Sequence, residues 1–355
     1  MPIDGNKNAT LYNAINKILL FIIIAPNIKS GGGKELLEYL LEYINDNYVD
    51  ILVNVYVDTS VNVESTHARN VFVITSELSK VILFFKRFEN VIYFGNLPPI
   101  RKSTNSLVYF HNTYLLMNLK KIFSNNSTFI NKVMCLAKQF YIKFFVKNVD
   151  FIACQTDVVG KQFKAKYSHE NIKILPFYRV CEKISMEKKF DYCYISLAHP
   201  HKNHKNLFDA LNILEVNKIN LSMAVTVESS KKELIQIIED INKRGIIKIV
   251  NFGVVPKEKV CEVYSLSKCL IFPSLEESFG LPLIEAVDMG LDVISSDLDY
   301  VCQIINPYKP IDIKEKFHLV INRYKEFEGM GKKSLKIAKL NFEPTNIVKS
   351  FLENI

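Results

Sequence analysis

The stretch "SLEESFGLPLIEA", residues 274–286, places two carboxylates, Glu277 and Glu285, eight positions apart around Gly280 and Pro282. The apolar run before it predicts a buried strand, and a proline suits the first turn of a helix. Backbone amides near Gly280 and Leu281 would then face outward from a helix N-terminus, where the dipole favours phosphate. Because Glu285 lies about one turn inside this helix, both carboxylates can flank one ligand.

The two carboxylates indicate what else that ligand carries. A carboxylate repels phosphate but accepts hydrogen bonds from hydroxyl groups. A ligand with phosphates in its middle and hydroxyls on both sides is a nucleotide-sugar. The alternative is that Glu277 is solvent-exposed and Glu285 only favours the helix dipole.

Apolar runs of strand length alternate with helical patterns along all 355 residues, which predicts parallel sheets covered by helices on both faces. A polar interval at residues 178–190 interrupts the pattern, so we predict domains at 1–182 and 183–335, with a C-terminal helix at 336–355 crossing back. Two such doubly wound domains normally bind a ligand in the crevice between them.

Composition excludes few classes. The net charge of +8 fits an anionic ligand, an anionic membrane or nucleic acid, but the basic residues are dispersed and no recognition motif appears. The seven cysteines have neither a CxxC pair nor metal-type spacing, which predicts thiols in a reducing compartment. The run "KILLFIIIA", residues 17–25, is too short to span a bilayer and predicts the first strand.

The longer stretch "PSLEESFGLPLIEAVDMGLDVISSD", residues 273–297, resembles the E-x7-E signature of retaining two-domain glycosyltransferases of family 4, many of which build bacterial surface polysaccharides. Ser278, where glycine is usual, is its only core departure. The resemblance implies that Glu277 contacts the donor sugar and Glu285 the nucleotide ribose. It extends the donor-binding set to Ser278, Phe279, Gly280 and Leu281.

A second match, "YISLAHPHKNHKNLFDAL" at residues 194–211, is similar to the family's strand, turn and helix around the donor diphosphate. Lys202 falls on the lysine that pairs with the diphosphate, and we expect it in an exposed loop. Leu197 stands where the family usually has an arginine, and His199 or His201 is a candidate replacement. Alone, this segment would be a solvated basic turn.

Three weaker features are also placed by the resemblance. Gly31, Gly32 and Gly33 match the glycine loop that lies against donor phosphates or acceptor, although an ordinary strand-to-helix turn explains them too. His111 ends a predicted strand where the family often has a histidine facing the donor sugar, and a structural histidine is the alternative. Val254 falls in the loop that holds the nucleotide base.

No metal and no cofactor are expected. The "DLD" at residues 297–299 looks like a metal motif, but no other acidic cluster supports it. The segment 119–148, which mixes lysines with aromatic residues, predicts a helix that contacts an anionic membrane or simply packs on the sheet.

Together these features predict an α/β protein with two Rossmann-like domains facing a central cleft, the GT-B architecture. We expect a cytoplasmic glycosyltransferase, at the inner face of the plasma membrane, whose partners include no nucleic acid. It would transfer a sugar from a nucleotide-diphosphate sugar, with retention, to a saccharide or undecaprenyl-linked glycan for O-antigen lipopolysaccharide or capsule. A sugar-nucleotide epimerase or a phosphorylase of the same architecture remains the alternative, followed by a nucleic-acid-binding protein.

Overall fold

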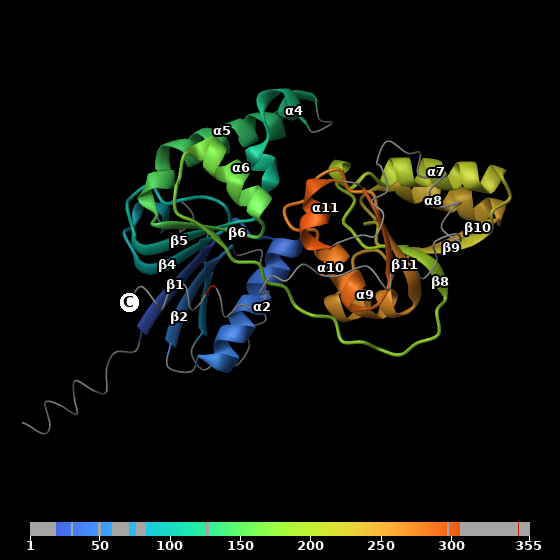
Figure 1. Cartoon of the computed structure of the whole chain (residues 1–355), viewed down its shortest axis with the longest axis horizontal. Coiled ribbons are helices and arrows are strands. Elements are labelled where there is room, and N and C mark those ends of the chain that lie inside the picture. Colours follow the sequence, from blue (N-terminus) through green and yellow to red (C-terminus); the bar gives the residue numbers. More distant parts are fainter. Residues whose placement is uncertain are drawn as a thin grey trace, which may run out of the picture.

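The structure is a computed structural model that describes residues 19–29, 31–48, 51–58, 71–75, 83–124, 128–296, 298–305 and 347. Figure 1 shows two α/β halves side by side, each with a sheet at its centre. The predicted fold class is confirmed, since both sheets are parallel and each carries helices between its strands.

The N-terminal half contains a seven-stranded sheet in the order β3-β2-β1-β4-β5-β6-β7, and every pair in it is parallel. Its strands are β1 (Leu19–Ala25), β2 (Ile51–Val57), β3 (Val71–Thr75), β4 (Glu89–Phe94), β5 (Thr104–Phe110), β6 (Phe151–Cys154) and β7 (Ile172–Ile174).

Helices cover both faces of this sheet, which is why its central strands carry continuous apolar runs such as residues 19–25, 91–94 and 107–110. On one face, α2 (Gly31–Asn47) buries a stripe of leucines at helical spacing together with inward side chains of β1 and β2. On the other face, α5 (Phe129–Phe145) and α6 (Asp157–Tyr167) pack on β4, β5 and β6. The sequence reading had passed over α6 because its residues are mainly polar.

The C-terminal half contains a five-stranded parallel sheet in the order β10-β9-β8-β11-β12. Its strands are β8 (Phe190–Tyr194), β9 (Leu221–Val225), β10 (Ile247–Asn251), β11 (Ser267–Phe272) and β12 (Asp292–Ser295). Its helices are η3 (Pro200–Lys202), α7 (His204–Val216), α8 (Lys232–Arg244), α9 (Lys257–Ser265), α10 (Leu281–Asp288) and α11 (Asp299–Ile304).

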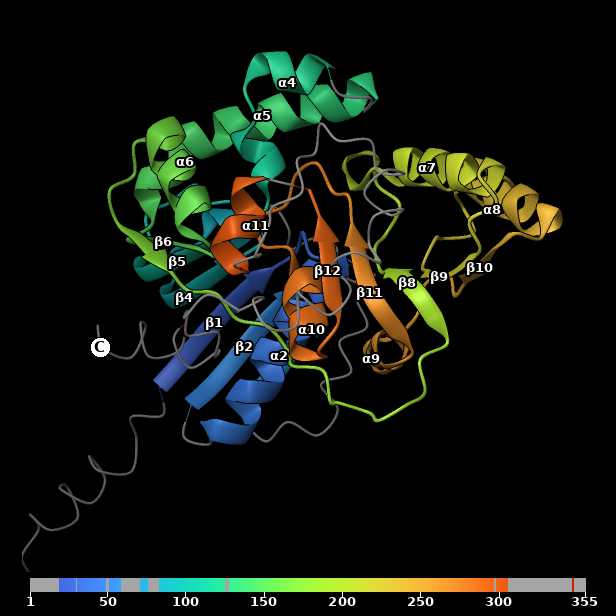
Figure 2. The same cartoon turned by 45° about the vertical axis from the view of Figure 1, so that its right-hand side comes forward.

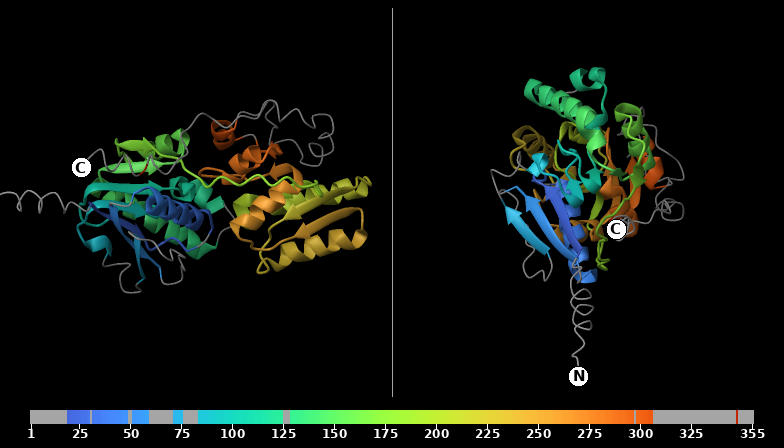
Figure 3. Two further views of the ribbon diagram at one scale, coloured as in Figure 1. Left: turned by 90° about the horizontal axis from the view of Figure 1, so that it is seen from below. Right: turned by 90° about the vertical axis from the view of Figure 1, so that its left-hand side faces the viewer.

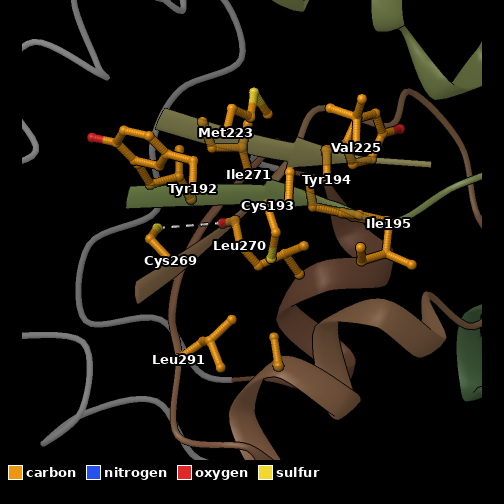
Figure 4. Packing of buried hydrophobic residues seen from close by; sticks show 14 of the residues in the cluster. Tyr192, Cys193, Tyr194, Ile195, Met223, Val225, Cys269, Leu270, Ile271 and Leu291 are labelled. Carbon is orange, nitrogen blue, oxygen red and sulfur yellow. Dashed lines mark hydrogen bonds between the residues drawn. The ribbon is translucent and has the colours of Figure 1, made fainter. Parts of the chain in front are cut away.

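One apolar core joins this sheet to its helices. Figure 4 shows part of it, where Leu270 and Ile271 of β11 pack beside Cys193 of β8 and Met223 of β9. All four side chains are fully buried, and each such aliphatic chain contributes about 1.5–3 kcal/mol. In Figure 2, α10 and α11 lie on the side of this half that is toward the N-terminal half.

The segment between the halves, residues 175–189, contains no helix or strand. Near its start it contacts both halves, because Arg179 Nη2 lies 2.5 Å from Glu42 of α2 and Tyr178 donates a 2.6 Å hydrogen bond to Asp288 of α10. Figure 3 shows this segment running between the two sheets. The division at residue 182 remains a prediction.

The cysteine prediction is wrong for one pair. The structure joins Cys181 of the connecting segment to Cys261 of α9 in a disulfide, with Cα atoms 5.5 Å apart. Folding brings together two cysteines 80 positions apart, which spacing along the chain did not reveal. The connecting segment is thereby attached to α9.

Two further expectations differ from the structure or fall outside it. The predicted helix at 119–148 is two helices, α4 (Leu119–Ser124) and α5, because Thr128 caps the second one by accepting from the Asn131 amide. The expected C-terminal helix lies outside the described residues except for Ile347, which is buried in the N-terminal core.

Candidate active site

Strand order places the site. In each sheet the order of successive strands reverses at one point, between β1 and β4 in the N-terminal half and between β8 and β11 in the C-terminal half. Ligands of such sheets bind outside the carboxyl ends of the strands at this point. The glycine triplet follows β1, Lys202 follows β8 and Glu277 follows β11, so three separate sequence motifs reach these positions.

Lys202 and Glu277 are brought together. Lys202 Nζ lies 2.5 Å from Glu277 Oε1, and only 15% and 11% of the two side chains are exposed. Backbone hydrogen bonding joins their loops, since the Leu275 amide donates to the His201 carbonyl at 2.8 Å. The Tyr194 hydroxyl also donates to the Lys202 carbonyl. The pair is therefore part of one fixed double loop.

This geometry corrects one expectation. Lys202 is not an exposed loop lysine, because it is largely buried against Glu277 and its ammonium lies 5.6 Å from the centre of the Phe272 ring. Removing either member of a buried ion pair leaves the other uncompensated. Substitution of Lys202 alone should therefore lower the stability of the free protein as well as its affinity for an anion.

Glu285 has a lysine partner of its own. It is 6% exposed and forms an ion pair with Lys257 at the start of α9, and it accepts a 3.0 Å hydrogen bond from the Tyr264 hydroxyl. The sequence reading missed Lys257 and Tyr264. The available signal was weak, because both precede Glu285 by more than twenty positions on a helix with no recognised motif.

The backbone between the two carboxylates suits a close-approaching ligand. Gly280 has a φ of 73°, in the left-handed region that glycine adopts without strain, and it precedes the first turn of α10. Phe279 is 2% exposed and its side chain belongs to the C-terminal core. Ser278 and Leu281 are partly exposed.

The three glycines of the predicted loop lie between the halves, but the structure has them in the first turn of α2 and not in a loop. A Cβ atom added to Gly31 would lie 3.5 Å from Leu197 Cδ1, and one added to Gly32 would lie 3.7 Å from Leu281 Cδ1. Both neighbours belong to the C-terminal half, so these glycines face the predicted donor site directly. Leu197 fills this position with apolar contact in place of the expected arginine.

His111 lies beside the same glycines. A Cβ atom on Gly33 would come within 3.1 Å of His111 Nε2. The His111 amide donates a 2.8 Å hydrogen bond to Asn96, and the ring lies 5.6 Å from the ring of Phe94. Burial lowers the pKa of His111 to about 4, although a hydrogen bond with the Tyr109 backbone acts in the opposite direction. His111 is therefore neutral near pH 7.

Two carboxylates that the sequence reading did not single out also lie at this junction. Glu276 accepts a hydrogen bond from Thr113 of the N-terminal half, and burial raises its pKa while Lys121 and that hydrogen bond lower it. Burial likewise raises the pKa of Glu35 on α2, which Lys257 and Arg179 partly offset. Charges from the two halves thus face each other across the junction.

The remaining predicted residues are more exposed or lie outside the described residues. His199 and His201 are exposed and lie with their rings 5.8 Å apart and nearly parallel, so replacement of the arginine by either remains a prediction. Val254 is 71% exposed, in a loop shaped by hydrogen bonds to Asn251. Asp297 lies outside the described residues, and among those described no group of three or more metal-binding side chains occurs.

Comparison with known sequences finds a family match in the C-terminal half. Residues 182–335 match the family model of glycosyl transferases group 1. The chain is 23% identical over 292 residues to the tRNA-queuosine alpha-mannosyltransferase of Drosophila melanogaster, covering 76% of this chain and 77% of that protein. It is 22% identical over 219 residues to the O-antigen chain mannosyltransferase RfbU of Salmonella typhimurium, covering 61% and 60%. It is 25% identical over 170 residues to the serotype-specific mannosyltransferase WbdA of Escherichia coli, covering 45% and 20%.

Solved structures agree on the fold. The sucrose-phosphate synthase of Thermosynechococcus elongatus superposes with a TM-score of 0.65 at 12% identity, over 94% of each chain. Anabaena Alr3699/HepE in complex with UDP and glucose superposes with a TM-score of 0.60 at 13% identity, over 94% of this chain and 98% of that one. The predicted GT-B architecture is thereby confirmed.

Proposed function

We propose that this protein is a retaining glycosyltransferase that uses a nucleotide-diphosphate sugar and a saccharide or lipid-linked glycan acceptor in surface polysaccharide assembly. The observation that carries the proposal is the pair of buried carboxylates, Glu277 with Lys202 and Glu285 with Lys257, before and within a helix whose Leu281 faces Gly32 of the N-terminal half. The group 1 match of residues 182–335 and the O-antigen mannosyltransferase relatives support it.

Lys202 can serve the diphosphate without leaving Glu277. An ammonium group has three donors, so one can stay on the Glu277 carboxylate while another reaches a phosphate oxygen. The N-terminus of α10 would face the same phosphates, and Gly280 permits close approach of the backbone. As the sugar leaves, negative charge grows on the diphosphate, and these fixed groups stabilise it.

Glu277 would then contact hydroxyls of the transferred sugar, and Glu285 those of the ribose. Lys257 and the Tyr264 hydroxyl hold Glu285 in place, so its carboxylate is oriented before the ligand arrives. We propose retention without a covalent intermediate, because the carboxylates assigned here have binding roles and the neutral His111 is a hydrogen-bond partner. Metal independence is part of the same proposal.

The identity of the sugar can be approached through the relatives. Since the three named above are mannosyltransferases by name, a mannosyl donor is the first to test. One of them acts by its name on the queuosine of tRNA, so an acceptor panel should contain tRNA beside saccharides and polyprenol-linked glycans.

The experiment is transfer by the purified full chain. Nucleotide sugars that raise the melting temperature would be incubated with each acceptor, and free nucleoside diphosphate would be measured with the anomeric configuration of the product. Acceptor-dependent release that Glu277→Ala abolishes is the expected result. Conversion of the donor sugar with no acceptor present would instead establish an epimerase.

A further inference from the structure

The helices α4 and α5 expose an unusual amount of apolar surface. Figures 1 and 2 show them at the outer edge of the N-terminal half, with no described element on their far side. We call their exposed side the α4–α5 face. Its large apolar residues are 47–73% exposed and are Leu119, Phe123, Phe129, Ile130, Val133, Met134, Phe140 and Phe144.

The exposed apolar residues of α5 lie on the side of the helix opposite to the residues that pack in the core. At 100° per residue, positions 130, 133, 137, 140 and 144 fall within an arc of about 80°. Cys135 and Ile142, the buried residues of α5, fall on the opposite side of the helix. The helix therefore has two apolar sides, and packing on the sheet accounts for only one of them.

The charge around the face has one sign. Residues 119–149 contain six lysines and no aspartate or glutamate. Lys120, Lys121, Lys138, Lys143 and Lys147 are exposed. On α5, Lys138 falls on one side of the apolar arc and Lys143 on the other, and Lys147 follows in the 3₁₀ turn η2 (Val146–Asn148). An apolar stripe bordered by lysines matches the boundary of an anionic bilayer, where acyl chains lie beneath negative headgroups.

We infer that the α4–α5 face docks the protein on an anionic lipid bilayer. A second copy is a poorer occupant, because a symmetric contact would bring the same cluster of lysines against itself. The face would lie along the surface without crossing it, since no described helix is long and apolar enough to span a bilayer.

This face is firmly attached to the active site. The chain leaves β5 at Phe110 and passes through His111 and η1 (Thr113–Leu116) directly into α4. The Tyr167 hydroxyl donates to the Leu115 carbonyl at 2.6 Å, and Gln139 donates to the Met117 carbonyl at 3.0 Å. Lys132 of α5 donates to the Phe123 carbonyl of α4 at 2.9 Å. Docking would thus hold the His111 side of the junction near the lipid surface.

Vesicle flotation tests the inference without any enzymatic activity. The full chain would be mixed with phosphatidylcholine vesicles containing phosphatidylglycerol, and with pure phosphatidylcholine vesicles. We expect binding to the anionic vesicles only, and release by added salt. Lys138→Gln/Lys143→Gln/Lys147→Gln should weaken binding about a hundredfold, at about 1 kcal/mol per lysine. Phe140→Ser/Phe144→Ser should weaken it by about tenfold or more.

Matched controls distinguish a loss of binding caused by the α4–α5 face from one caused by the lower net charge of the protein. Lys218→Gln/Lys232→Gln/Lys248→Gln removes three exposed lysines from the C-terminal half, and Val216→Ser removes an apolar side chain that is 83% exposed. Both controls should float like the wild type. Equal losses in the two lysine triples would overturn the inference, as would equal binding to both vesicle types or a wild-type chain that never floats.

Sedimentation equilibrium tests the alternative occupant. A concentration-dependent dimer that Phe140→Ser/Phe144→Ser dissociates would assign the face to a second copy. The docking inference stands apart from the proposed function, since transfer activity on a soluble acceptor can persist whether or not the face binds lipid.

Discussion

The two halves of the molecule meet at the active site with different chemistry. The C-terminal half brings two lysine–carboxylate pairs, Lys202–Glu277 and Lys257–Glu285, each less than one-sixth exposed. The N-terminal half brings three glycines and a neutral His111. The C-terminal half therefore brings paired charges to the proposed donor site, whereas the glycines and His111 of the N-terminal half bring backbone and a neutral ring.

The largest effect is expected at Glu277. Glu277→Gln keeps the size of the side chain but removes the charge that faces the sugar hydroxyls, so kcat should fall by about a hundredfold to a thousandfold. Steady-state kinetics with saturating donor measures it. A kcat within threefold of wild type would remove Glu277 from the chemistry and weaken the contrast between the halves.

Glu285→Gln should act on donor affinity instead. Loss of one charged hydrogen bond to the ribose is worth about 1.5–3 kcal/mol, which is roughly a tenfold to hundredfold rise in the dissociation constant of the nucleoside diphosphate. Titration calorimetry checks this, with kcat at saturating donor as the companion measurement. If kcat falls and affinity does not, the two carboxylates have exchanged roles.

Buried His204 in α7 predicts the pH dependence of stability in the C-terminal half. It is 2% exposed, and burial lowers its pKa from 6.5 to about 4. The unfolded chain binds the proton more tightly, so His204 contributes full stability above pH 6.5 and loses it as pH falls toward 4. Between pH 7 and 5 this amounts to about 2 kcal/mol. In urea unfolding, the free energy of unfolding of His204→Phe should fall less between pH 7 and 5 than that of the wild type. If it falls as much as in the wild type, His204 is not the cause of the pH dependence.

The smallest expected effect is a difference in kcat/KM between alanine substitutions at two neighbouring glycines of the N-terminal half. Gly33→Ala places a Cβ atom 3.1 Å from His111 and 3.2 Å from Ile28, whereas Gly32→Ala makes an ordinary 3.7 Å contact with Leu281. We expect Gly33→Ala to lower kcat/KM by roughly tenfold, since displacing a packed side chain costs about 1–3 kcal/mol. Gly32→Ala is the matched control and should stay near wild type.

The sequence was most informative where one short stretch holds the chemistry. Glu277, Gly280 and Glu285 lie within nine positions, so a strand, a turn and a helix were enough to place them together. The alternation of apolar runs likewise predicted both parallel sheets. The alternation of apolar runs did not show which strands are neighbours. The strand order of the structure shows that Lys202 and Glu277 follow adjacent strands.

Contacts between distant segments were not predictable in the same way. Lys257 meets Glu285 only because α9 and α10 pack on the same strand, and Cys181 meets Cys261 only because the connecting segment runs beside α9. Neither pair has a local pattern. The break between α4 and α5 did have one, since Thr128 before an apolar helical run is an N-cap signal.

We propose that Lys202 holds the donor diphosphate at the junction of the halves, and nucleotide-dependent stabilisation is the sharpest test of this role. A nucleoside diphosphate at a hundred times its dissociation constant should stabilise the wild type by about 2.7 kcal/mol. Because Lys202→Met also leaves Glu277 without its partner, the ligand-induced increment is measured in Lys202→Met/Glu277→Gln against Glu277→Gln alone. We predict that most of the increment disappears with Lys202, and an increment equal in the two variants would contradict the account.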